Sequence, residues 1–173
     1  MAKVQQESQY YLSEINTQVM NYKVYVMNTT ERWLYTLVLI VAGGCIGLVF
    51  YGGLFQSESG PTLLTYISNI IVFLVVGLLA VKVFLPMITE ALRKKRVDKL
   101  KEQFVDFASS LTNALSSGMN MNNAIYAVYT DLKAQYPEDA YIVLEVKELL
   151  DGLSNNLSIE FLLEQFGERS GEM

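Results

Sequence analysis

Two nearly uncharged stretches decide the fold of this chain. WLYTLVLIVAGGCIGLVFYGGLF runs from Trp33 to Phe55 without a charge, and LLTYISNIIVFLVVGLLAVKVFL runs from Leu63 to Leu85 with Lys82 as its one charge. As helices rising about 1.5 Å per residue, each is about 35 Å long, enough to cross a hydrocarbon layer of about 30 Å. Lys82 lies near the end of its stretch, where its side chain can reach the headgroups. The sequence predicts two transmembrane helices, 33–55 and 63–85.

Two other interpretations of these stretches are weaker. A secretory signal peptide is disfavoured because the first stretch begins only after residue 32, is too long, and is followed by Gly-Gly-Leu-Phe-Gln instead of a small-x-small cleavage site. A buried hairpin of a soluble protein is disfavoured because apolar residues occur on every side of each helix, whereas a soluble helix carries them along one stripe.

The distribution of basic residues predicts the membrane topology. The connection Gln56–Thr62 contains no Lys or Arg, whereas residues 86–101 form a basic collar after the second stretch. The positive-inside rule places this collar in the cytoplasm, and a hairpin returns the amino-terminal segment, residues 1–32, to the same side. The collar either binds anionic lipid headgroups at the membrane surface or serves only as the topological signal, and the two roles are compatible. Its basic residues are Arg93, Lys94, Lys95, Arg96, Lys99 and Lys101.

Composition excludes much familiar chemistry. The chain has 173 residues, a net charge of -5, no His and a single Cys. Imidazole bases, His-based triads, His/Cys zinc sites and intrachain disulfides are therefore excluded, and neither a G-x-x-x-x-G-K-[ST] phosphate loop nor a Glu-x-x-His motif is present. The basic collar contrasts with an acidic segment, residues 102–173. We expect no cofactor, no metal, no catalytic residue and no nucleic-acid partner.

Residues 102–173 have the spacing of an antiparallel helical bundle. A first amphipathic helix ends at Ser116-Ser117-Gly118, Asn120 caps a second, Pro137 lies in the first turn of a third, and Ser158 begins a fourth. Pro86 is expected to close or kink the second membrane helix. The apolar positions that predict the four helices are Leu100, Phe104, Phe107, Leu111 and Leu115, then Ile125, Val128, Tyr129 and Leu132, then Ile142, Val146, Leu149 and Leu153, and finally Leu162, Leu163 and Phe166.

Two short segments repeat the same corner. Gly118-Met119-Asn120-Met121 and Asn156-Leu157-Ser158-Ile159 each place a residue that tolerates left-handed backbone, an apolar residue and a short polar N-cap between two helices. Leu157 and Leu162 have the spacing of a hydrophobic staple. The predicted fold is all-α, with two similar helix pairs after the membrane hairpin. The corner residues are Ser117, Gly118, Asn120, Asn156, Ser158 and Gly171.

Gly43 and Gly47 form a G-x-x-x-G face in the first membrane helix, which allows close approach of another helix. Glycine is also frequent in membrane helices, so this spacing does not by itself define an interface. Cys45 between them is interpreted as a small packing residue. In residues 1–32 the pattern favours neither helix nor strand, although Asn28–Glu31 has capping-box spacing at the start of the first membrane helix.

Many carboxylates occur along the bundle, and a metal or acid–base site must be weighed against a solvated face. We favour the solvated face, because these residues recur at positions opposite the apolar stripes. They are Asp106, Asp131, Glu138, Asp139, Glu145, Glu148, Asp151, Glu160, Glu164 and Glu168.

Two segments, KLKEQFVDFASSLTNALSSGMNMNNAIYAV and NLSIEFLLEQFGERSG, carry a resemblance to a known family. Over residues 28–171 the chain resembles the platform proteins of the type II secretion F-domain superfamily, in particular those of Flp (Tad) pilus assembly. The likeness rests on the Ser116-Ser117-Gly118 corner, on Ala124-Ile125 and on Glu168-Arg169-Ser170-Gly171. Leu162 departs from the pattern, since the family often has a small residue there.

The resemblance implies a non-enzymatic scaffold in the inner membrane that couples a cytoplasmic secretion ATPase to pilin assembly. The implied partners are that ATPase, pilin, a second F-domain membrane protein, the lipid bilayer and further copies in a homo- or hetero-oligomer. Family members usually continue beyond the Glu168–Gly171 turn, so the chain resembles a fragment or a truncated gene product. We therefore expect exposed apolar faces, together with either self-association or poor order after about Ser158.

Two other functions remain open. One is a two-span signalling protein with a cytoplasmic helical relay domain, although the short connection Gln56–Thr62 is too small to form a ligand pocket. The other is a membrane enzyme that uses carboxylates alone, which would need acidic residues within or beside the spans, and the spans contain none.

Overall fold

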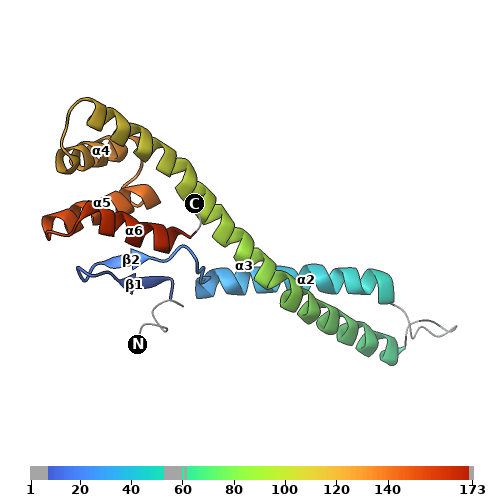
Figure 1. Ribbon diagram of the computed structural model, residues 1–173. Coiled ribbons are helices and arrows are strands. Elements are labelled where there is room, and N and C mark those ends of the chain that lie inside the picture. Colours follow the sequence, from blue (N-terminus) through green and yellow to red (C-terminus); the bar gives the residue numbers. More distant parts are fainter. Residues whose placement is uncertain (1–7, 53–59, 61, 172–173) are drawn as a thin grey trace. The chain divides into compact units, whose positions relative to one another are not determined.

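The structure is a computed structural model that describes residues 8–52, 60 and 62–171. In these residues the chain is mostly helical, which confirms the all-α prediction, with one small hairpin before the helices (Figure 1). The chain divides into two compact units. One, the membrane-type unit, is Val26–Leu92, and the other, the bundle unit, combines the residues up to Tyr25 with those from Arg93 onward.

Helix α2, Thr29–Tyr51, opens the membrane-type unit. The backbone N–H of Asn28 donates to Glu31 Oε2 at 3.3 Å, which confirms the predicted capping box and explains why the helix starts at Thr29. The helix thus begins four residues before the apolar stretch, and residues 53–55 of that stretch lie outside the described residues. Most of the connection Gln56–Thr62 also lies outside them.

Helix α3, Leu63–Ser116, is a single helix that contributes residues to both units. It continues through Pro86, so the structure does not close the second membrane helix there. Proline lacks the N–H that would bond to the carbonyl four residues earlier, a loss that a long helix tolerates when its neighbouring turns are intact. The basic collar, residues 86–101, is accordingly part of one helix, and the first bundle helix is the last portion of α3.

Both α2 and α3 are long and apolar enough to cross a membrane, by length and composition. Only 17% of the most apolar window of α2 and 6% of that of α3 is buried, whereas the core helix of a soluble protein is mostly buried. This exposure disfavours the buried soluble hairpin. Large exposed side chains on the two helices include Trp33, Leu37, Val49, Phe50, Leu63, Leu74 and Leu79.

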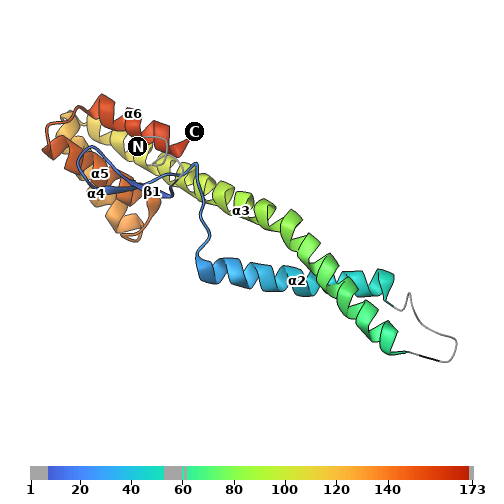
Figure 2. The same ribbon diagram turned by 90° about the horizontal axis from the view of Figure 1, so that it is seen from below.

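Helices α4, α5 and α6 complete the bundle unit with the end of α3, and their bounds are Met121–Gln135, Tyr141–Ser154 and Ile159–Ser170 (Figure 1, Figure 2). Helix α5 begins after Pro137 instead of at it, because Pro137 accepts a turn hydrogen bond from Ala140 N–H at 2.9 Å before the helix starts. The apolar stripes predicted from spacing meet in one core. It includes Leu100, Phe107, Ile125, Val128, Leu132, Ile142, Val146, Leu149, Leu162 and Phe166.

The amino-terminal segment, whose structure the sequence left open, packs on this bundle. We call residues 8–25 the arm. It contains strands β1, Tyr10–Leu12, and β2, Gln18–Met20, paired antiparallel with Tyr11 opposite Val19. Val19 and Tyr22 are buried, and Tyr22 belongs to the bundle core. The arm therefore contributes to the core of the bundle, and α6 after Ser158 packs on the same core through Leu162 and Phe166. Self-association stays a prediction.

Candidate functional site

The site is the seam where the arm meets helices α5 and α6. Tyr22 from the arm donates its phenol hydrogen to Glu145 Oε1 of α5 at 3.0 Å, and Arg169 of α6 forms an ion pair with Glu145 Oε2. The backbone N–H of Tyr22 also donates to the carbonyl of Arg169 at 3.1 Å. All three residues are at least 95% buried, so a carboxylate and a guanidinium meet away from water.

A second carboxylate of α5 holds the turn of the arm. Thr17 Oγ1 donates to Glu148 Oε2 at 2.5 Å and shares a 2.6 Å hydrogen bond with Ser13 Oγ. Ser13 N–H in turn donates to the Thr17 carbonyl at 2.8 Å. Since Glu145 and Glu148 are three residues apart on a helix, they lie on the same face of α5 and both point toward the arm. The arm is thus attached through two carboxylates of α5, in addition to the backbone hydrogen bond from Tyr22 to Arg169 of α6.

Burial determines the ionisation of this cluster. Burial raises the pKa of Tyr22, and the nearby charge of Glu145 adds to the rise, so the phenol keeps its proton and donates it. Burial also raises the pKa of Glu145, whereas Arg169 and the Tyr22 hydroxyl oppose the rise. Burial acts to lower the pKa of Arg169, but Glu145 outweighs it and the pKa is raised. The arrangement suits holding segments together, because the Tyr22 hydroxyl and one terminal nitrogen of Arg169 both have the Glu145 carboxylate as their acceptor.

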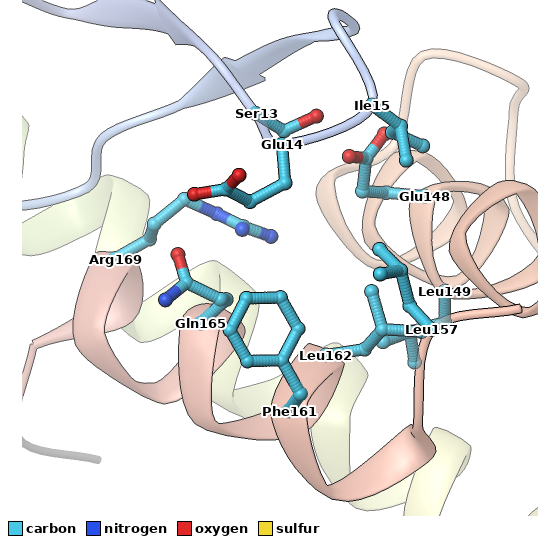
Figure 3. A pocket seen from close by; sticks show the side chains of 10 residues that line it. All are labelled: Ser13, Glu14, Ile15, Glu148, Leu149, Leu157, Phe161, Leu162, Gln165 and Arg169. Carbon is cyan, nitrogen blue, oxygen red and sulfur yellow. The ribbon is translucent and has the colours of Figure 1, made fainter. Parts of the chain in front are cut away.

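A small cavity opens beside Arg169. Its volume is about 20 Å³, room for about one water molecule, and its walls come from the turn of the arm, from α5 and from α6. Figure 3 shows the guanidinium of Arg169 extending into this space, with the carboxylates of Glu14 and Glu148 around it. Arg169 Nε is buried and finds no hydrogen-bond partner among the described residues.

A larger groove of about 230 Å³ lies along the same seam, between β2 and the outward side of α5. Its walls include Met20 from the arm and Leu144, Lys147 and Asp151 from α5, together with Glu148. Two cavities thus border the arm, one the size of a water molecule and one a groove.

The basic collar lies on α3, with Lys94, Lys95, Lys99 and Lys101 exposed and Arg93 and Arg96 partly buried. The guanidinium of Arg96 stacks over the Tyr25 ring at 4.4 Å, and Lys99 Nζ lies 5.9 Å from the centre of the Tyr141 ring. Two collar cations therefore face aromatic side chains of the bundle unit. Binding of anionic lipid by this collar stays a prediction.

Gly43 and Gly47 face α3 of the same chain. A Cβ on Gly43 would lie 2.6 Å from Ala80 Cβ, and one on Gly47 would lie 2.9 Å from Val76 Cβ. On the α3 side, a Cβ on Gly77 would lie 2.8 Å from the Ile40 carbonyl oxygen. The glycine face thus serves the contact between α2 and α3 within this chain.

The repeated corners have the predicted geometry. Gly118 and Asn156 have φ values of 85° and 62°, the left-handed conformation that ends a helix, and Gly171 after α6 has φ 78°. Asn120 accepts from Asn123 N–H at 2.9 Å, and Ser158 accepts from Phe161 N–H at 3.2 Å, so both are N-caps. Ser117 Oγ donates to the Asn113 carbonyl at 2.8 Å in the first corner.

The prediction that the carboxylates all lie on a solvated face is wrong for Glu145 and Glu148. The apolar stripe of α5 contains Ile142 and Leu149, and Glu145 lies between them on the same side of the helix. The partners that bury Glu145 lie far away in the sequence, so the pattern of α5 alone carried no signal for them. In the described part of the chain, no group of three or more Cys, Asp or Glu residues could hold a metal ion.

Together, fold and site define a mostly helical protein that has two helices able by length and composition to cross a membrane, and a helical bundle closed by an amino-terminal arm over a buried ion pair. Comparison of the chain with protein-family models, curated proteins and solved structures finds no match.

Proposed function

We propose that this chain is a membrane platform protein of a Flp (Tad) pilus or a related type II secretion machine. In this role it couples a cytoplasmic secretion ATPase to pilin assembly, and the bundle unit is the part that meets the ATPase. The observation that carries the proposal is that the three sequence elements behind the family resemblance are the ones that organise the bundle.

Each of these elements has a structural task. The Ser116-Ser117-Gly118 corner ends α3 through the left-handed Gly118. Ala124 and Ile125 are fully buried on α4. Arg169 and Ser170 are buried at the end of α6, where Arg169 pairs with Glu145. A resemblance confined to surface residues would lack this support.

The departure at residue 162 also fits the bundle. Leu162 is buried, and the facing residue on α5 is Gly152, where an added Cβ would lie 2.4 Å from Leu162 Cδ2. The large side chain of Leu162 on α6 thus packs against a glycine on α5, which leaves room for it. The pair keeps α5 and α6 close, so the large residue at position 162 does not prevent the two helices from packing.

The proposed location is the inner membrane, with both described ends of the chain in the cytoplasm. The exposed apolar surfaces of α2 and α3 suit contact with lipid, and the basic collar follows the apolar part of α3, where the positive-inside rule places cytoplasmic residues. Further partners in the proposal are pilin, a second F-domain membrane protein and additional copies of the chain.

Site-specific photo-crosslinking in the native cells tests this proposal. A crosslinking amino acid replaces Tyr126, which is 66% exposed on α4, in the full reading frame. A matched control places it at Val49, which is 82% exposed on α2. The crosslinked products are solubilised in detergent and identified by mass spectrometry.

Capture of a hexameric secretion ATPase from position 126 but not from position 49, together with a second F-domain membrane protein in the solubilised complex, would support the platform function. Recovery of a kinase or another signalling protein, with no ATPase or pilin, would contradict it and favour the two-span signalling function.

A further inference from the structure

The seam between the arm and the bundle has the composition of an interface that forms and breaks. It buries an ion pair, Glu145 with Arg169, and a second carboxylate, Glu148, under the arm. Charged groups of this kind lose hydration when covered and regain it when exposed. The free energy needed to uncover the seam is therefore smaller than the free energy needed to uncover an apolar surface of equal area.

In the part of the chain that the structure describes, one buried polar atom of the seam lacks a hydrogen bond, and the packing there leaves two cavities. Arg169 Nε is buried without a hydrogen-bond partner among the described residues, and an orphaned buried donor carries a desolvation penalty. The cavity of about 20 Å³ beside Arg169 and the groove of about 230 Å³ along α5 both lie between the arm and the helices. Opening the seam relieves the penalty and loses few close contacts at these places.

The arm depends on the bundle, whereas the bundle depends little on the arm. Each strand of the arm has three residues, and an isolated two-stranded hairpin is marginal in water. The core of the bundle comes almost wholly from α3 to α6, for example through Phe104, which lies 6.0 Å from the Phe166 ring and 5.5 Å from the Phe107 ring. Tyr22 is the one fully buried core residue that the described part of the arm supplies.

We infer that the arm is a separable cover, which leaves the bundle as a unit while α3 to α6 stay folded and thereby exposes the Glu145, Glu148 and Arg169 cluster. Two hydroxyl-to-carboxylate hydrogen bonds, from Tyr22 and Thr17, hold it closed. This regulatory opening does not depend on the proposed function, because it concerns contacts within the chain.

Amide hydrogen exchange of the full chain in detergent tests the inference. Tyr22→Phe removes the hydroxyl but keeps the ring, and Thr17→Val removes the second hydroxyl. Tyr136→Phe is the matched control, because Tyr136 also donates to a carboxylate, that of Asp106, away from the arm. Exchange is followed by mass spectrometry in peptides that cover the arm, α4 and α5.

In Tyr22→Phe the backbone amide hydrogens of the arm should exchange roughly 10- to 100-fold faster, which is the factor expected from losing a hydrogen bond to a charged group. These include the amide of residue 22, which donates to the Arg169 carbonyl. Thr17→Val should act in the same direction. Exchange in α4 and α5 should stay unchanged in both, and Tyr136→Phe should leave the arm unaffected.

Two results would overturn the inference. If α4 and α5 accelerate by the same factor as the arm, the arm and the helices form one cooperative unit. If neither Tyr22→Phe nor Thr17→Val accelerates exchange in the arm, the two carboxylates do not hold it closed.

Discussion

Arg169→Met is the substitution with the largest predicted effect on the bundle. It leaves the Glu145 carboxylate, which is 4% exposed as a residue, with the Tyr22 hydroxyl at 3.0 Å as its remaining described side-chain donor. Removing one partner of a buried ion pair costs about 3–5 kcal/mol, a large part of the about 5–15 kcal/mol that stabilises a typical domain. The unfolding equilibrium constant should therefore rise by more than about a hundredfold.

Pulse proteolysis of the full chain in detergent, across a urea series at pH 7, measures this loss. The double variant Glu145→Leu with Arg169→Met should recover most of it, because an apolar pair of similar size has no charge to leave uncompensated. The loss in the single variant should also shrink in acid. Burial raises the folded pKa of Glu145 above its unfolded value, and Arg169 opposes that rise. Without Arg169 the rise is larger, so the single variant gains more stability than the parent chain as pH falls toward the unfolded value.

A loss of less than about 1 kcal/mol for Arg169→Met, or a double variant as unstable as the sum of its single substitutions, would refute this reasoning. The first result would mean that water already reaches the ion pair in the folded bundle. The second would mean that the two residues act independently of each other.

Four further substitutions test the helices and the pH response. Gly43→Val should lower the thermal stability of the chain in detergent, because even a Cβ there would lie 2.6 Å from Ala80 Cβ. Gly167 lies on α6 with open space around it, so Gly167→Ala should stabilise the chain by about 0.5–1 kcal/mol and raise the urea midpoint. Gly118→Ala should cost about 1–2 kcal/mol in urea unfolding, because φ there is 85°. Burial raises the folded pKa of Tyr22, so its contribution to stability should be present below pH of about 10 and decline above it, and Tyr22→Phe should weaken that decline in an alkaline titration followed by circular dichroism.

Local chemistry was sufficient to predict the corners between helices. A left-handed position followed by an N-cap is specified within four residues, and Gly118, Asn120, Asn156 and Ser158 all take the predicted conformations or hydrogen bonds. The apolar stretches likewise carry their own signal for two long helices. Features set by neighbouring residues were therefore readable from the sequence.

Features set by distant residues were not. The burial of Glu145 depends on Tyr22, 123 residues earlier, and on Arg169, 24 residues later. The spacing of apolar residues along α5 carries no information about either partner. Each strand of the arm is too short to show alternation, so the hairpin became visible only through its packing on α5 and α6. At Pro86, the local preference for a helix end was outweighed by the length of good helix on both sides.

The attachment of the arm also sets an order of events during synthesis. Tyr22 leaves the ribosome 123 residues before Glu145, and at about 5–20 residues per second this separation is about 6–25 s. Arg169 follows later still. During that interval the newly made arm lacks the α5 carboxylates that it binds, and both long apolar helices are translated. The arm can thus be seated only after Glu145 and Arg169 have been made.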